Sequence, residues 1–411
     1  MSKAMQNRSQ RLRLTVGPET VRMLELGHPW VIADRYTARW PKFEVGELAE
    51  LTSEQGRPLG TALLDPGARI VARLLSRAPL KLDRDWLVKR MQQGNQARQW
   101  LELGDTTAWR LINGEGDHLP GLTIDRYGEY LLLQYYSPSW EPYLDALCEA
   151  ARQVYQPLGI YGKFRPQETR RLAGQQGSQG RLLWGKPAPD DYCVREQGLC
   201  YRVDLVRDLH SGLFLDQRDN RQRFRRLAAG AKVLNLFAYT GAFSVTAAAG
   251  GALSVTSVDA AGRYLAWATE NFRCNGIDPS PHRFLTEDCF QALEQFAETG
   301  ESFDLIFIDP PSFSTTRKSR FTTSGGTAEL VRRALRLLPA GGLLVTSSNL
   351  AKMSFSDYLK ELRRGANDAR RTLQILEVAG QGGDFPFTAS FPEGCYLKYV
   401  VSVVQDHIGI E

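Results

Sequence analysis

Three carboxylates in the second half of the chain each follow a short apolar run, in the order Asp259, Asp288 and Asp309. The apolar runs are rich in β-branched residues and alternate with segments of helical pattern, which is typical of βαβ units on a parallel sheet. Ligands of such sheets bind beyond the carboxyl ends of the strands. We therefore expect the three acids at one edge of a sheet, where they could bind a common ligand.

The turn after the first of these runs indicates which ligand to expect. A dinucleotide site needs three spaced glycines, so that the backbone can approach a pyrophosphate. Here Tyr239-Thr240-Gly241 has one glycine only. Asp259 is placed to accept from both hydroxyls of a ribose, and Asp288 could accept from an adenine amino group. Ribose and adenine without phosphate describe S-adenosylmethionine, whereas the alternative is an ordinary βαβ core whose strand-end acids cap helices.

The segment Asp309-Pro310-Pro311-Ser312-Phe313 carries the sharpest chemical signal. Two prolines directly after a buried strand end that strand and leave carbonyl groups without ladder partners. Asp309 could accept from an amino or imino group of a planar base, and Phe313 offers a face for stacking. The prolines would help to hold the base. We expect this segment to form the catalytic wall of the site.

These segments resemble the motifs of class I S-adenosylmethionine-dependent methyltransferases that act on large-subunit ribosomal RNA. The resemblance extends over nearly the whole chain. The matching segments are L-F-L-D-Q-R (213–218), N-L-F-A-Y-T-G (235–241), V-D-A (258–260), D-P-P-S-F (309–313) and F-P-E-G-C-Y-L-K (391–398). The resemblance implies that RNA is the partner, that no metal is needed, and that S-adenosylmethionine is bound. The residues that would bind it are Gln217, Asn235, Phe237, Tyr239, Thr240, Gly241, Asp259, Asp288 and Asp309.

Two methylation chemistries are compatible with a base as the acceptor. Cytosine C5 becomes nucleophilic only after a thiolate has added to the neighbouring ring carbon, whereas guanine N7 has a lone pair of its own. The relatives with a PUA domain before the catalytic domain are mostly cytosine-C5 enzymes, with their cysteine just after the fifth strand. This chain has T-S-S-N-L-A-K-M-S (346–354) there, with Asn349 in the place of that cysteine.

The catalytic motifs are closer to a guanine-N7 branch of large-subunit rRNA methyltransferases, whose turn after the fifth strand also carries Asn. We therefore favour non-covalent N-methylation, with Asn349 bonded to the edge of the base. One alternative is a cytosine-C5 reaction that uses another cysteine. An alternative of another class is a non-catalytic RNA-binding or ribosome-assembly factor. A small-molecule or protein methyltransferase is a third.

The composition is that of a globular, mildly basic protein. The 411 residues are 43% hydrophobic and 24% charged, with a net charge of +5, which is compatible with RNA binding. Six cysteines without a CxxC pair give no sign of a disulfide framework. The chain has no apolar run of membrane-helix length and no secretory signal at its N-terminus, so we expect a cytoplasmic protein. A homodimer is compatible with these features.

The pattern predicts an α/β protein of three domains. Residues 11–77 contain short strands between Gly, Pro and Asp turns, and resemble the PUA domain, a small RNA-binding β-barrel. Residues 78–200 form an α+β connector domain, which we expect to pack and space its neighbours. Residues 201–411 form a Rossmann-like domain with a seven-stranded sheet, the last strand being antiparallel.

Several smaller features complete the prediction. We expect His28 and Trp30 in the core of the first domain. Residues 165–190 have the composition of a mobile loop that could touch RNA. A hairpin is expected over 200–215, followed by a basic helix at 218–226 with a solvated face. The segment 314–327 is expected to be either a lid or a plain solvated loop, and as a lid it would bind RNA phosphates through Arg317, Lys318 and Arg320.

Overall fold

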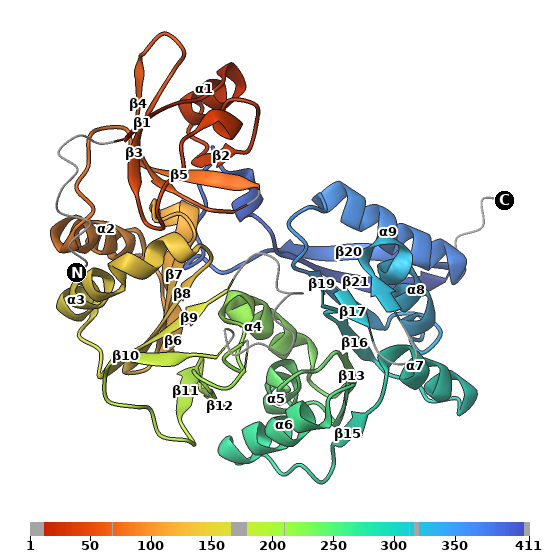
Figure 1. Cartoon of the computed structure of the whole chain (residues 1–411). Helices are drawn as coiled ribbons and strands as arrows, with labels where there is room; N and C mark the ends of the chain where they lie inside the picture. The colour runs from red at the N-terminus through yellow and green to blue at the C-terminus, as the bar shows by residue number, and fades with distance from the viewer. Residues whose placement is uncertain are drawn as a thin grey trace.

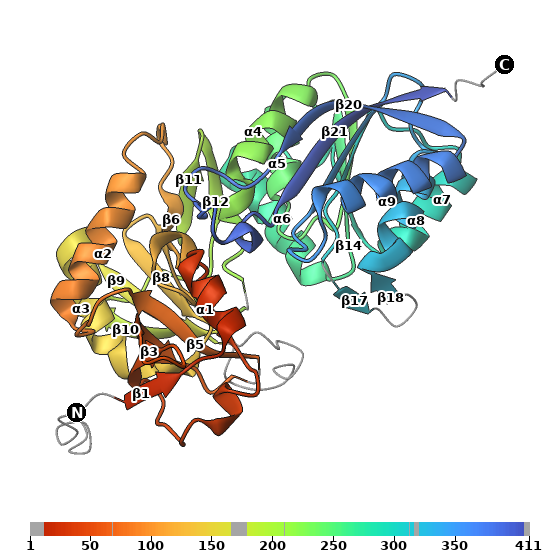
Figure 2. The same ribbon diagram turned by 90° about the horizontal axis from the view of Figure 1, so that it is seen from above.

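The computed structural model describes residues 12–67, 69–165, 179–208, 210–311, 313–315 and 320–406, with the backbone alone for residues 313–315 and 320–325. The N-terminal and connector domains lie together on one side of the molecule, and the catalytic domain lies on the other (Figure 1). The segment between the last two strands of the catalytic domain returns to the first two domains (Figure 2). In the described part of the chain, no helix is long and apolar enough to cross a membrane.

The N-terminal domain consists mainly of short strands, as the turn pattern predicts, and they form a five-stranded sheet in the order β1-β3-β4-β5-β2. Its core is apolar and includes Leu14, Val31 and Leu51. One helix was not predicted, α1, which starts with a proline in its first turn and buries Leu24. The elements are β1 (Leu12–Thr15), α1 (Pro18–Glu25), β2 (Trp30–Ile32), β3 (Leu48–Thr52), β4 (Pro58–Leu64) and β5 (Ile70–Ser76).

The connector domain is a second five-stranded sheet, in the order β10-β9-β8-β7-β6, with two helices on one face. Strand periodicity directs Leu122 and Ile124 towards those helices. Thr123 and Asp125 therefore lie on the opposite face, which is polar. The elements are α2 (Arg84–Ala97), β6 (Ala108–Asn113), β7 (Leu122–Tyr127), β8 (Tyr130–Tyr135), α3 (Leu144–Tyr155), β9 (Gly159–Phe164) and β10 (Arg181–Gly185).

Part of the segment predicted as a mobile loop is a strand. Within 165–190, β10 pairs antiparallel with β9 and so completes one edge of the connector sheet. The prediction of a loop over 181–185 is therefore wrong, because tertiary pairing supplies the strand with a partner that the local composition does not reveal. Residues 166–178 lie outside the described residues.

The hairpin before the catalytic domain is displaced from its predicted place. It consists of β11 (Cys193–Glu196) and β12 (Leu199–Arg202). Residues 210–214 have no regular secondary structure, and the 3-10 turn η7 (Leu215–Gln217) leads into α4 (Arg218–Leu227). The prediction of a hairpin over 200–215 is thus wrong in register, because the turn lies at Gln197-Gly198.

Helix α4 is basic, and two of its arginines are buried. Arg221 and Glu196 are each about 2% exposed and form two hydrogen bonds of 2.6 Å. Arg218 is equally buried and bonds to Asp384 at 2.9 Å. The prediction of a solvated face is therefore only partly right, because distant carboxylates neutralise these two arginines inside the protein, whereas Arg223 is partly exposed and Arg226 is exposed.

The catalytic domain has a seven-stranded sheet in the order β15-β14-β13-β16-β19-β21-β20, with β21 antiparallel to both neighbours. This confirms the predicted sheet, including its antiparallel last strand. Helices α7, α8 and α9 cover one face, and α4 and α5 cover the other. The strands are β13 (Lys232–Leu236), β14 (Ser254–Asp259), β15 (Arg283–Thr286), β16 (Leu305–Ile308), β19 (Leu343–Ser348), β20 (Arg371–Ala379) and β21 (Lys398–Asp406). The helices are α5 (Ala242–Ala249), α6 (Gly262–Cys274), α7 (Cys289–Glu298), α8 (Thr323–Ala334) and α9 (Phe355–Asp368).

The segment predicted as a lid is only partly described. Its backbone includes β17 (Phe313–Thr315) and β18 (Arg320–Thr322), which pair as an antiparallel hairpin. Arg317 and Lys318 lie outside the described residues, as do the side chains of Phe313 and Arg320. Phosphate binding by this segment stays a prediction.

Candidate functional site

The carboxyl ends of four parallel strands meet at one edge of the catalytic sheet. Leu236 of β13 is in register with Val258 of β14 and Ile308 of β16, and Ile308 is in register with Thr346 of β19. The residues that follow these strands therefore lie side by side. They are the turn 237–241, Asp259, Asp309 and the segment around Asn349.

The turn after β13 is held in an unusual backbone conformation. Phe237 and Tyr239 have positive φ angles of 56° and 49°, which are rare for residues with bulky side chains. Gly241 has a φ of 71°, and a Cβ atom there would lie 2.6 Å from Cβ of Ala268. Such strain persists where the surrounding structure enforces it, most often at ligand sites.

Asp259 and Cys289 support this turn. The backbone N–H of Tyr239 donates to Oδ2 of Asp259 at 2.9 Å, and that of Phe237 donates to Sγ of Cys289 at 3.3 Å. Oδ1 of Asp259 accepts from the N–H of Ala261 at 2.9 Å. Because a carboxylate has about four acceptor positions, Asp259 retains capacity for ribose hydroxyls. Burial raises its pKa, and the two backbone hydrogen bonds oppose that rise.

Asn235 and Thr240 lie inside the protein. Nδ2 of Asn235 donates to Oγ of Ser244 at 2.8 Å, and Oγ1 of Thr240 donates to the carbonyl of Gly212 at 2.6 Å. These hydrogen bonds link two predicted cofactor residues to α5 and to the segment before η7. Tyr239 packs its ring against neighbouring aromatic rings, and its hydroxyl has no partner among the described residues. A bound adenosyl group would fit this combination of a strained turn and an unpartnered hydroxyl.

Asp288 has a structural role at the start of α7. Its Oδ1 accepts from the backbone N–H groups of Phe290 at 3.0 Å and Gln291 at 3.4 Å, so it is the N-cap of the helix. The geometry at Asp288 therefore agrees with the alternative that a strand-end acid caps a helix. Capping and an adenine contact are compatible, because they need different acceptor positions of one carboxylate.

Replacing Asp288 separates these two roles. We expect Asp288→Ala to lower the free energy of unfolding by about 1 kcal/mol, because the cap is lost. We expect the same variant to weaken S-adenosylmethionine binding about tenfold, as for the loss of one hydrogen bond to a charged group. Asp288→Asn is the control for stability, since Asn caps helices as well as Asp. Denaturant unfolding and calorimetric titration measure both quantities, and wild-type cofactor affinity in Asp288→Ala would leave the residue as a cap alone.

Asp309 is partly buried directly beyond β16. Its Oδ2 accepts from Nε2 of Gln217 at 3.1 Å, and the same Nε2 donates to Oγ of Ser347 at 2.8 Å. Oε1 of Gln217 accepts from Nδ2 of Asn220 at 2.7 Å, so Gln217 is fixed at both ends. Burial raises the pKa of Asp309 to about 6, and the nearby carboxylate of Asp216 adds to the rise. Gln217 thus orients Asp309, and its predicted contact with the cofactor stays a prediction.

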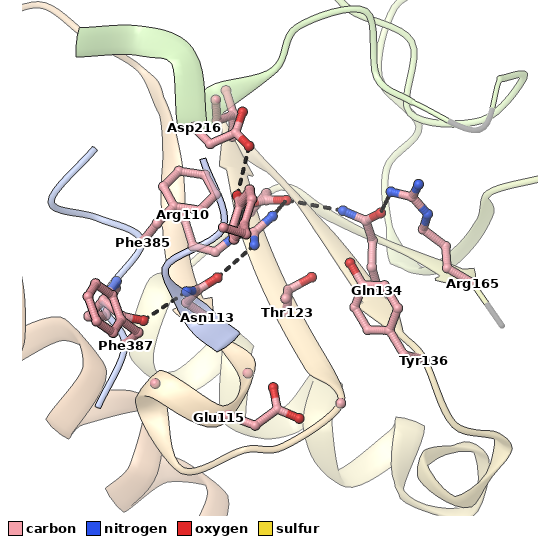
Figure 3. Close-up of a pocket in the computed structure, with 18 of the residues that line it drawn as sticks. Arg110, Asn113, Glu115, Thr123, Gln134, Tyr136, Arg165, Asp216, Phe385 and Phe387 are labelled. Carbon is pink, nitrogen blue, oxygen red and sulfur yellow. Dashed lines mark hydrogen bonds and ion pairs between the residues drawn. The ribbon is translucent and has the colours of Figure 1, made fainter. Parts of the chain in front are cut away.

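A cavity of about 720 Å³ opens beside Asn349 and Asp216 (Figure 3). Residues from all three domains line it, including Trp30 of the first domain and Gln134 of the connector. Asp216 accepts at 2.7 Å from the hydroxyl of Tyr396, which belongs to the segment between β20 and β21. Cavities of this size commonly bind small molecules.

Trp30 lies at a junction between domains and not in a domain core. Its Nε1 donates to Oε1 of Glu115 in the connector at 2.7 Å, and its ring contacts Phe391 at a centroid distance of 4.8 Å. His28 is buried and accepts from the backbone N–H of Trp30, and it contacts the same phenylalanine ring. The prediction of burial is right for His28, whereas Trp30 is only partly buried.

The remaining predicted site residues take different places. Pro310 is buried and Pro311 is exposed. Asn349 is exposed and lines the cavity, as a base contact requires. Sequence reasoning missed Asp216 and Tyr396, although both lie inside the quoted motifs at 213–218 and 391–398.

The cysteines offer little to a covalent mechanism. Cys289 is buried below the turn after β13, and burial raises its thiol pKa strongly. Cys148 is buried in the connector core. No cysteine is among the described residues that line the cavity. Cys395 is exposed and lies between Gly394 and Tyr396, which do line it.

In the described residues no group of three or more His, Cys, Asp or Glu side chains is arranged to hold a metal ion.

Comparison with protein families gives two matches. Residues 119–389 match the family described as S-adenosylmethionine-dependent methyltransferase. Residues 14–77 match the PUA-like domain.

Individual relatives match over nearly their whole length. A protein of Erwinia tasmaniensis named Ribosomal RNA large subunit methyltransferase I is 37% identical over 94% of this chain and 98% of its own. A protein of the same name from Escherichia coli O139:H28 is 35% identical over 95% and 98%. A methyltransferase crystallised with SAH, the demethylated cofactor S-adenosylhomocysteine, superposes with a TM-score of 0.86 at 32% identity, over 95% of this chain and 100% of that one.

Proposed function

Because the chain belongs to the S-adenosylmethionine-dependent methyltransferase family and has a PUA-like N-terminal domain, we propose that it methylates a base of large-subunit (23S) ribosomal RNA. The names of its relatives support this substrate. The observation that carries the proposal is the position of Asp309. Its carboxylate lies at the edge of the catalytic sheet, where the strained turn follows β13, and Gln217 holds it there. Its neighbour Asp216 lines a cavity large enough for a nucleotide. We further propose the cytoplasm as its location, while the homodimer stays a prediction.

The protein's own part in the reaction is to position the acceptor. S-adenosylmethionine supplies an electrophilic methyl group on sulfur, so the acceptor atom must be held in line with it. A base inside folded RNA has to leave its stack to reach such a site. Asp309 would accept from the amino or imino edge of the base, and Asn349 would bond to it from the neighbouring strand end. Gln217 acts as a positioning residue, because it orients Asp309.

We favour a non-covalent transfer to a nitrogen such as guanine N7. The described residues that line the cavity provide carboxylates and amides but no thiol, which supports a lone-pair nucleophile. A cytosine-C5 reaction would need a thiolate, and Cys395 is the candidate nearest to the cavity lining.

The experiment uses the purified protein, methyl-labelled S-adenosylmethionine and deproteinised large-subunit rRNA, followed by digestion to nucleosides. Label in 7-methylguanosine is the expected result. Label in 5-methylcytidine would contradict the lone-pair mechanism, and no label despite cofactor binding would favour the assembly factor.

Cysteine variants test the mechanism independently. We expect Cys395→Ser to keep its rate of transfer within about twofold of the wild type, because no covalent step passes through the thiol. Cys193→Ser is the matched control, since Cys193 is also exposed but belongs to the β11–β12 hairpin. Loss of transfer in Cys395→Ser alone would support the covalent alternative.

The pH dependence of transfer should report the ionisation of Asp309. The carboxylate can accept from a base only when ionised, and its pKa is raised to about 6. The rate is therefore expected to rise with pH through about 6 and to level off above about 7. Single-turnover rates between about pH 5 and pH 8.5 test this, and the low residual rate of Asp309→Asn should show no inflection. A rate that falls with rising pH would contradict the assignment.

A further inference from the structure

The connector sheet contributes one face to the cavity, although its sequence suggested only a spacer. Thr123 of β7 is in register with Asn113 of β6 and with Gln134 of β8, and all three line the cavity. The other face of the same strands packs on α2 and α3. The cavity-facing side is therefore a polar surface that the catalytic domain covers (Figure 3).

Most polar groups on this face are bonded to each other. Arg110 makes two hydrogen bonds to Asp125, at 2.7 and 2.9 Å, and a third to Asn113 at 2.8 Å. Asp125 also accepts from Gln134 at 3.1 Å, and Gln134 accepts from Arg165 at 3.0 Å. This network is rigid because each member is held by the next.

The hydrogen bonds of this network do not include the hydroxyl of Thr123. Thr123 is only 6% exposed, yet its Oγ1 has no hydrogen-bond partner among the described residues. Nε of Arg165, another lining residue, is likewise buried without a partner. Burying a hydroxyl without a partner is unfavourable, so such groups in a cavity point to a ligand that completes them.

The cavity also has the apolar surface that a planar ligand needs. The ring centroid of Phe385 lies 4.4 Å from Cζ of the Arg110 guanidinium. Phe387, on the same segment, is 45% exposed. Phe214 lines the cavity from the catalytic side. Aromatic side chains beside hydrogen-bonding groups are typical of pockets that receive an unstacked base.

We propose that this three-domain cavity receives the target nucleotide, and that Thr123 of the connector domain hydrogen-bonds to its base. The inference rests on the proposed function and specifies where the RNA base is recognised. Specificity is then divided, with Asn349 of the catalytic domain lining the cavity and the connector binding another edge of the base. Asp216 joins the two sides, because it lines the cavity and precedes Gln217, which orients Asp309.

The test compares Thr123→Val with Thr123→Ser in the full-length protein. Valine keeps the shape and strand preference of threonine but removes the hydroxyl. We expect kcat/KM for deproteinised large-subunit rRNA to fall about 3- to 10-fold in Thr123→Val, as for the loss of one neutral hydrogen bond. Thr123→Ser should remain within about twofold of the wild type, and S-adenosylmethionine affinity, measured by calorimetry, should be unchanged in both.

Ser402→Ala is the matched control. Ser402 is also a buried hydroxyl without a partner among the described residues, but it lies in β21 opposite Leu344, near the start of β19 and away from the site. If the wild type transfers label and Thr123→Val behaves like Ser402→Ala, the inference is overturned and the proposed function stands. It is also overturned if Thr123→Val changes cofactor affinity and not the kinetics with RNA. A wild type without transfer to the RNA overturns the proposed function and this inference with it.

Discussion

Replacing Asp309 by alanine is expected to lower the single-turnover rate of methyl transfer by about a thousandfold or more, even at saturating cofactor. The carboxylate is the group held at the strand edge by Gln217. Truncation removes the acceptor for the base and leaves Nε2 of Gln217 with Ser347 alone. Rapid-quench measurements with labelled cofactor would give the rate.

Asp309→Asn is the control for folding. A carboxyl whose pKa is raised in the folded protein binds more protons there than in the unfolded chain, so its ionisation destabilises the fold as pH rises from about 4 to 6. At pH 7.5 the neutral amide should therefore unfold no more easily than the wild type. An inactive and stable Asp309→Asn supports a direct role for the carboxylate. Wild-type activity in both variants would contradict that role.

Replacing Glu196 by alanine is expected to cost about 3–5 kcal/mol in the free energy of unfolding. Glu196 and Arg221 are both about 2% exposed, and their two bonds of 2.6 Å join the β11–β12 hairpin to α4. The variant would leave a buried guanidinium without its counter-charge. Chemical denaturation followed by fluorescence measures the loss.

The matched control is a second ion pair made by an arginine of α4. Arg223 of α4 pairs with Glu377 at 2.8 Å, but the two side chains are 33% and 46% exposed. Glu377→Ala should therefore cost less than about 1 kcal/mol, because water screens the pair. A loss in Glu196→Ala no larger than in Glu377→Ala would show that the buried pair does not stabilise the junction.

Part of the candidate site follows from local sequence. The turn 237–241 and the acids Asp259 and Asp309 each stand directly after an apolar strand, and parallel strands bring such positions to one edge. Motif spacing also anticipated that Asn349 would follow the fifth strand. These predictions depend on strand periodicity and chain order, which are local properties.

The partners of individual side chains did not follow from the sequence. Gln217 bonds to Asp309, 92 positions later in the chain, which is a partner that the motif does not specify. Its predicted contact with the cofactor stays a prediction. Asp288 caps α7, so its carboxylate has a role that the strand pattern could not separate from ligand binding. Each of these outcomes depends on where a second, distant residue comes to lie.

The sequence by itself determined the three-domain order, the seven-stranded catalytic sheet and the choice of cofactor, because hydrophobic periodicity and turn chemistry act over a few residues. Only the tertiary structure decided that one face of the basic helix α4 is buried, since Arg218 and Arg221 are neutralised by Asp384 and Glu196. It also decided that the connector sheet faces the site with Thr123. A strand pattern shows which residues share a face, but the neighbour that covers that face is set by contacts between domains.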